Sequence, residues 1–116
     1  MRYTKNMQYL YKQFSHKKKR VFKVEKSKEK LLKIIKKHLP NSNVILFGSR
    51  ARKTNQPGSD IDIALDTGKE IKFGTILDIR NDLDESLIPY KVDIIDMHNI
   101  DKDLQEEIKK EGIVWK

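Results

Sequence analysis

Three aspartates lie in segments with the pattern of β-strands. Asp60 and Asp62 alternate with isoleucines in residues 60–65, and Asp93 lies in the short apolar run 92–95. Successive side chains of a strand point to opposite faces, so Asp60 and Asp62 share one face. If the strand of Asp93 lies beside the strand of Asp60 and Asp62, three carboxylates converge and repel one another unless a divalent cation is present. Oxygen ligands of this kind suit Mg²⁺ or Mn²⁺, and two such ions can stabilise both the attacking and the leaving oxygen of a phosphoryl displacement.

A glycine–serine pair follows the apolar run 44–47. Glycine lets a backbone approach a phosphate closely, and the Ser49 hydroxyl and the amides after it can donate to phosphate oxygens. Arg50 and Arg52 add positive charge beside Gly48 and Ser49. The sequence therefore predicts a loop that holds a nucleoside triphosphate, opposite acids that hold its metal ions.

The remaining pattern predicts an α/β domain, a small mixed sheet with helices packed on it. Apolar residues at helical spacing predict a helix from an N-cap at Ser27 to Pro40, a second carrying Phe73 to Leu87, and a last one that ends at Gly112. Residues 44–47 are expected to form a strand buried on both faces, and residues 113–115 an edge strand.

Length and composition exclude several classes of protein. The 116 residues suffice for one small domain with a real core. The absence of cysteine excludes a disulfide scaffold, a zinc–thiolate site, an iron–sulfur cluster and a cysteine nucleophile. No apolar run approaches the roughly 20 residues that cross a bilayer, and no secretory signal pattern is present, so a cytoplasmic protein is expected.

The charge is unevenly distributed along the chain. The net charge is +8, and residues 1–26 hold nine of the 25 basic residues but one of the 17 acidic ones, which leaves 16 of each in residues 27–116. This divides the chain into a basic N-terminal extension, residues 1–26, and a neutral domain, residues 27–116. Aromatic residues beside a basic block can contact single-stranded nucleic acid, or the extension can be a loosely docked arm.

The motif order resembles a known family. Gly48-Ser49, ten further residues and then Asp60-x-Asp62 is similar to the signature of the nucleotidyltransferase superfamily related to DNA polymerase beta. The small size resembles its minimal nucleotidyltransferase (MNT) branch, many of whose members act as antitoxins beside a HEPN-domain toxin. The resemblance covers about residues 27–116 and implies the nucleotidyltransferase fold for them, while the extension lies outside it.

The resemblance implies a role for each motif residue. Asp60 and Asp62 would ligate both metal ions, and Asp93 would complete one metal site and help to deprotonate the acceptor hydroxyl. Gly48 and Ser49 would bind the β- and γ-phosphates, and one of the two arginines that follow would offset phosphate charge.

The resemblance also implies the reaction: transfer of a nucleoside monophosphate, AMP from ATP, to a hydroxyl, with release of pyrophosphate. In toxin-paired members the acceptor is a tyrosine of the toxin. Because so small a chain has little left with which to build an acceptor pocket, a second subunit is expected. Two alternatives stay open: a catalytically silent module that neutralises a partner by occlusion, and a nucleic-acid-binding protein that uses the basic extension.

Several further residues carry their own expectations. Relatives often have glycine where Lys53 stands, so lysine would cost stability if the backbone needs a positive φ there. Asp96 lies three residues after Asp93, on the opposite face of the strand, and stays outside the predicted site. The three histidines are too far apart in sequence to suggest a metal site and are expected to be structural or solvated: His16, His38 and His98.

Overall fold

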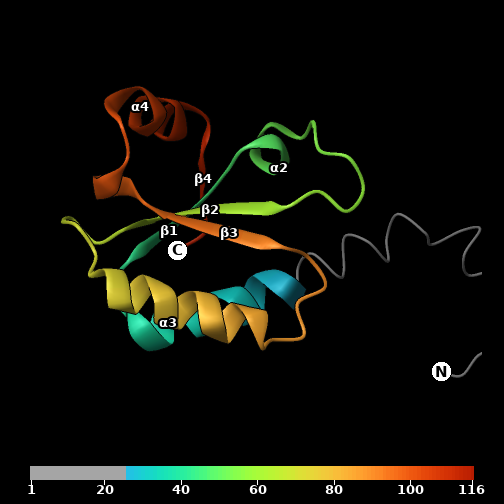
Figure 1. The fold of residues 1–116 in the computed structure, drawn as a ribbon. Helices are drawn as coiled ribbons and strands as arrows, with labels where there is room; N and C mark the ends of the chain where they lie inside the picture. Colours follow the sequence, from blue (N-terminus) through green and yellow to red (C-terminus); the bar gives the residue numbers. More distant parts are fainter. Residues whose placement is uncertain (1–25) are drawn as a thin grey trace, which may run out of the picture.

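Four strands form one mixed sheet in the order β3-β2-β1-β4 in this computed structural model, which describes residues 26–116 (Figure 1). Strand β1 (Asn43–Phe47) pairs antiparallel with β2 (Ile61–Asp66) and with β4 (Ile113–Val114), and β2 pairs in parallel with β3 (Val92–Asp96). The predicted α/β fold and the edge strand at the C-terminal end are confirmed. The proposed nucleic-acid contact of the basic extension lies outside the described residues, apart from Lys26.

Helices cover both faces of this sheet. The helix at residues 26–38 and α3 (Phe73–Asp84) lie on one face, below the sheet in Figure 1, whereas α2 (Ser49–Arg52) and α4 (Lys102–Glu111) lie on the other. In β1, Val44 and Leu46 belong to the core beneath the sheet, while Ile45 and Phe47 pack against Ala64 and the α4 side. The strand is therefore buried on the face of Val44 and Leu46 but only half-buried on the other, where its continuous apolar pattern predicts burial on both.

Two details of the helices differ from the sequence prediction. The first helix already includes Lys26, so Ser27 lies inside it and is buried, instead of capping its N-terminus. Helix α3 ends at Asp84, and Leu87 lies beyond it with 85% of its surface exposed. The reason is local: the Ser86 hydroxyl donates to the Leu83 carbonyl oxygen (2.6 Å), a side-chain contact that competes with further helical turns.

An imidazole–carboxylate contact joins the two helices beneath the sheet. His38 Nε2 lies 2.6 Å from Asp82 Oδ2 in α3, and Lys37 Nζ lies 3.6 Å from the same oxygen. The hydrogen bond with His38 is the main cause that lowers the pKa of Asp82. His38 is therefore structural, as expected from the sequence.

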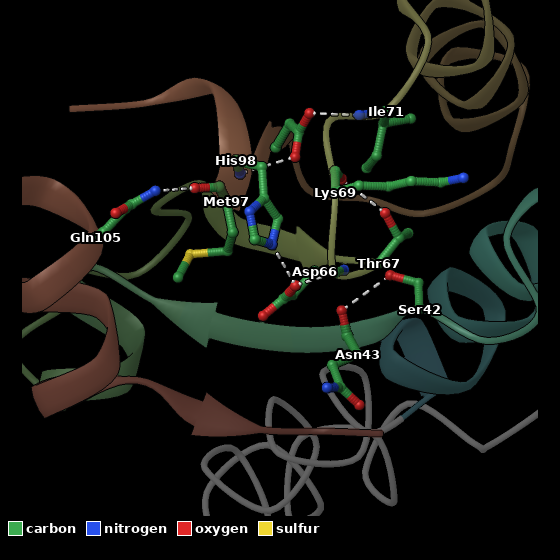
Figure 2. A network of polar contacts seen from close by, with 11 residues as sticks. Ser42, Asn43, Asp66, Thr67, Lys69, Ile71, Met97, His98 and Gln105 are labelled. Atoms are coloured by element: carbon green, nitrogen blue, oxygen red, sulfur yellow. Dashed lines mark hydrogen bonds and ion pairs between the residues drawn. The ribbon is translucent and has the colours of Figure 1, made fainter. Parts of the chain in front are cut away.

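A polar network fixes the other end of the parallel strand pair (Figure 2). The Asp96 carboxylate accepts from the backbone amides of Ile71 (2.7 Å) and His98 (2.9 Å), and His98 Nε2 lies 2.8 Å from Asp66 Oδ1. These contacts hold the loop before α3 and the short helix η1 (Met97–Asn99) against the ends of β2 and β3. Asp96 is buried in this network, which agrees with its exclusion from the predicted site.

Gly112 ends α4 as predicted, but not for the conformational reason that usually favours glycine there. Its φ is −70°, outside the left-handed region. A Cβ at this position would lie 2.5 Å from the Ile108 carbonyl oxygen and 2.6 Å from Ile45 Cγ2. Glycine therefore lets the end of α4 approach β1.

Within residues 26–116, the helices are too short or too polar to span a bilayer.

Candidate active site

The three predicted aspartates lie near the start of the parallel strand pair. Asp62 of β2 is the register partner of Asp93 in β3, and Asp60 lies just before β2. Parallel neighbours in register share a face of the sheet, and Asp62 shares its face with Ala64, on the α4 side. The predicted adjacency of the strands is confirmed.

The electrostatics of Asp62 reflect this neighbourhood. Its pKa is raised above the ordinary value, first by burial, then by the negative charges of Asp93 and Asp60. The positive charges of Arg50 and Arg52 lower it, but do not outweigh these causes. The site therefore concentrates negative charge that is only partly compensated, which favours a cation.

The glycine–serine loop closes directly onto Asp62. Gly48 has φ 76° and ψ −157°, a combination that L-residues rarely adopt. A Cβ on Gly48 would lie 2.4 Å from Asp62 Oδ2, so only glycine allows the carboxylate to stay in this position. Ser49 then opens α2, in which the amides of Ala51 and Arg52 both donate to the Gly48 carbonyl oxygen (3.1 Å each). The predicted proximity of the loop and the acids is confirmed.

Lys53 ends α2 in the left-handed conformation, with φ 62° and ψ 31°. The turn is closed by the Thr54 amide, which donates to the Ser49 carbonyl oxygen (2.9 Å). The positive φ that would make lysine unfavourable at this position is confirmed. An L-residue in this region costs about 1–2 kcal/mol of stability.

The two arginines after the loop are already engaged by other groups. Arg50 Nε and Nη2 both donate to the carbonyl oxygen of Ser59 (3.1 and 2.7 Å), and the guanidinium carbon lies 4.7 Å from the centre of the Tyr90 ring. Arg52 Nη1 lies 3.8 Å from Glu111 Oε2, a buried oxygen without a hydrogen bond. Arg50 thus fastens the residue before Asp60 to α2 and to the segment before β3.

Sequence reasoning missed this use of Arg50. Its acceptor is a backbone carbonyl oxygen, which any residue type would offer, and its aromatic neighbour lies 40 positions away in the chain. Neither Ser59 nor Tyr90 belongs to a motif, so no sequence signal marks them.

The three aspartates offer the type of ligand that a divalent cation prefers, although their side chains are not close enough together to form a metal site. Asp93 Oδ1 lies 3.9 Å from Lys91 Nζ, and its side chain is about half exposed. Among residues 26–116, no three acidic or histidine side chains gather closely enough to form a finished metal site. The ligands present are nevertheless all carboxylate oxygens on one face, and the missing Cβ of Gly48 leaves the Asp62 carboxylate unobstructed. Asp60, Asp62 and Asp93 therefore supply the kind of oxygen ligand that a divalent ion would need.

Comparison with known proteins identifies the family of this chain. Residues 29–115 match the family described as polymerase beta, nucleotidyltransferase. The probable protein adenylyltransferase MntA of Haemophilus influenzae is 28% identical over 81 residues, which make up 70% of this chain and 71% of that protein. A putative protein adenylyltransferase of Methanocaldococcus jannaschii is 30% identical over 83 residues, or 72% of this chain and 84% of that protein.

Solved structures share the fold. A chain of a toxin–antitoxin complex with AMP-PNP superimposes with a TM-score of 0.64 and 24% identity, covering 75% of this chain and 70% of that one. A chain of the complex between tri-AMPylated Shewanella oneidensis HEPN toxin and MNT antitoxin gives 0.60 and 21%, covering 78% and 69%. With the family match spanning nearly all described residues, this chain belongs to the polymerase beta nucleotidyltransferase family.

Proposed function

We propose that this chain transfers AMP from ATP to a tyrosine hydroxyl of a HEPN-type partner in the cytoplasm, and so acts as the antitoxin of a pair. The observation that carries the proposal is the closure of Gly48 onto Asp62, with Asp93 as the register neighbour of that carboxylate. Relatives described as protein adenylyltransferases support it, as does the likeness to a complex that holds an AMP-modified HEPN toxin.

Each part of the site has a task in this reaction. Gly48 and Ser49 bind the β- and γ-phosphates through the backbone and the serine hydroxyl. Asp60, Asp62 and Asp93 would hold two divalent cations, Mg²⁺ or Mn²⁺, whose charge stabilises the attacking and leaving oxygens. A bond forms between the acceptor oxygen and the α-phosphorus, while the bond from that phosphorus to the pyrophosphate breaks.

The remaining residues hold this geometry. Asp93 is half exposed and lies at the outer strand of the sheet, where it can accept the proton of the acceptor hydroxyl. Arg50 keeps the Ser59 carbonyl, and hence Asp60, in a fixed position relative to the loop. Arg50 and Arg52 act on the phosphates through their charge, since Arg50 donates to the Ser59 carbonyl oxygen and Arg52 lies near Glu111.

The test is intact-mass analysis of the protein encoded beside this chain, after incubation with the chain, ATP and Mg²⁺. We expect one or more AMP-sized increments on that protein, and none with the Asp60→Ala, Asp62→Ala double variant. Asp66→Ala is the matched control, because Asp66 lies on the same face of the same strand but pairs with His98 away from the site.

The outcomes separate the candidate functions. Increments that persist in the double variant would overturn the catalytic assignment. A stable complex without any increment would instead favour an antitoxin that acts by occlusion.

A further inference from the structure

The order of strands in the sheet sets the direction from which an acceptor can reach the site. Gly48 follows β1, Asp62 lies in β2 and Asp93 in β3, which is the last strand on that side within residues 26–116. In an in-line displacement the acceptor attacks opposite the leaving pyrophosphate. If the loop at Gly48 holds the pyrophosphate end of ATP, as the proposed function requires, the acceptor arrives from the side of β3.

A cavity opens at that edge. It has a volume of about 370 Å³ and lies between the C-terminal half of α3, the loop at residues 86–91 and β3. Its lining combines apolar side chains, among them Leu83 and Ile88, with the charged groups of Arg80 and Asp84. Its volume is within the range of ligand pockets, and its exposed lining is more polar than apolar.

The cavity and the candidate active site share Asp93 but use opposite faces of β3. Val92 and Ile94 line the cavity and pack with the core beneath the sheet, where α3 lies in Figure 1. The Asp93 side chain alternates with them and therefore points to the face of Asp62. A ligand that reaches both must pass around the outer edge of β3.

An extended polypeptide meets this requirement. A segment that adds to an edge strand places alternate side chains on the two faces of the sheet. One side chain would then enter the cavity beneath the sheet, while its neighbour in sequence would carry a hydroxyl to Asp93 above it.

We propose that this cavity and the outer edge of β3 form the docking site for the partner segment that carries the acceptor hydroxyl. The segment is extended, and the side chain directly before or after the acceptor residue fills the cavity. The proposal rests on the proposed function for its choice of occupant, since it takes the acceptor to be a protein.

Two neighbouring acids allow a matched test. Asp84 and Glu85 are both exposed at the end of α3, but only Asp84 lines the cavity. Asp84→Trp puts a bulky ring at the cavity, and Glu85→Trp makes the same chemical change beside it. Ser86→Trp is a second variant, which fills the cavity from the side of the loop. Thermal unfolding of each variant shows whether it is folded.

Two readouts are measured with the protein encoded beside this chain as the probe. The first is its Kd for each variant by calorimetry without nucleotide, and the second is the rate of AMP transfer at varied partner and ATP concentrations. We expect Asp84→Trp and Ser86→Trp to raise the Kd and the KM for the partner at least tenfold, with the KM for ATP unchanged. Glu85→Trp should match the wild type.

A wild-type Kd for the partner in both cavity variants would overturn the docking site, whether or not AMP is transferred. Loss of partner binding in these variants, from a wild type that binds but transfers no AMP, would support the docking site and overturn the proposed reaction instead.

Discussion

Replacing Gly48 with alanine should damage the active site far more than it damages the fold. The backbone there has φ 76° and ψ −157°, a region in which an L-residue costs about 1–3 kcal/mol. The new Cβ would also lie 2.4 Å from Asp62 Oδ2, whereas real contacts of this kind are essentially never shorter than 3.0 Å. The carboxylate must therefore move by more than half an ångström. Displacements of about 1 Å at a reacting centre lower rates by roughly 10²-fold.

A second glycine separates the two effects. Gly68 has φ 87°, but a Cβ there would meet nothing within 4 Å, and it follows β2 at the end away from the site. Gly48→Ala and Gly68→Ala should both lower the free energy of unfolding, measured in urea, by about 1–3 kcal/mol. Only Gly48→Ala should lower kcat/KM for AMP transfer, by about 10²-fold. Wild-type transfer by Gly48→Ala, or an equal loss in Gly68→Ala, would refute the contact between the loop and Asp62.

Four further outcomes follow from the contacts of single residues. Asp62→Asn should abolish transfer yet stabilise the metal-free protein at pH 7. The pKa of Asp62 is raised by folding, so the protein loses stability as the pH rises through that pKa, and the substitution removes this loss. Urea unfolding at pH 3, where the carboxyl is neutral, should show no gain from the substitution. Lys53→Gly should leave transfer intact and raise the free energy of unfolding by about 1 kcal/mol or less, since relief of left-handed strain is partly offset by the greater freedom of the unfolded chain. Asp82→Asn should destabilise the protein in urea at pH 6, and the difference from the wild type should shrink as the pH falls below about 4. The reason is that a carboxyl whose pKa is lowered by His38 contributes stability that is lost as pH falls through the lowered pKa. Arg50→Lys keeps the charge but loses the paired contact with a carbonyl oxygen, so kcat should fall while the KM for ATP changes little; a wild-type kcat would show that the charge alone suffices.

The sequence was most informative where a side chain's task depends on strand periodicity. Asp60 and Asp62 had to share a face because the alternation with isoleucine continues into a buried strand. The adjacency of Asp93 needed one further assumption, that a helix returns the chain to a parallel neighbour, and α3 provides that return. The sequence explains Gly48 by the close approach of a phosphate to the backbone. The structure adds a second reason, because a Cβ at this position would clash with the Asp62 carboxylate.

The sequence was least informative where a contact depends on one backbone atom or on where a helix stops. Arg50 was predicted as a phosphate-binding residue from its place beside the loop, and its hydrogen bonds to the Ser59 carbonyl oxygen could not be anticipated. Leu87 continues the apolar pattern of α3, yet the Ser86 hydroxyl helps to end that helix before it. Ser27 is of a residue type that is frequent at helix N-caps, but packing of the first helix buries it instead.

The charge balance of the site favours catalysis over simple occlusion of a partner. The charges of Arg50 and Arg52 lower the pKa of Asp62, but burial and the negative charges of Asp93 and Asp60 outweigh them, so this pKa stays raised. Ionised Asp62 therefore costs stability in the absence of a cation. An interface that merely covered a partner would gain nothing from this cost, or from a backbone conformation at the preceding loop that only glycine readily adopts. Both features become useful once cations and a triphosphate neutralise one another between the loop and the acids.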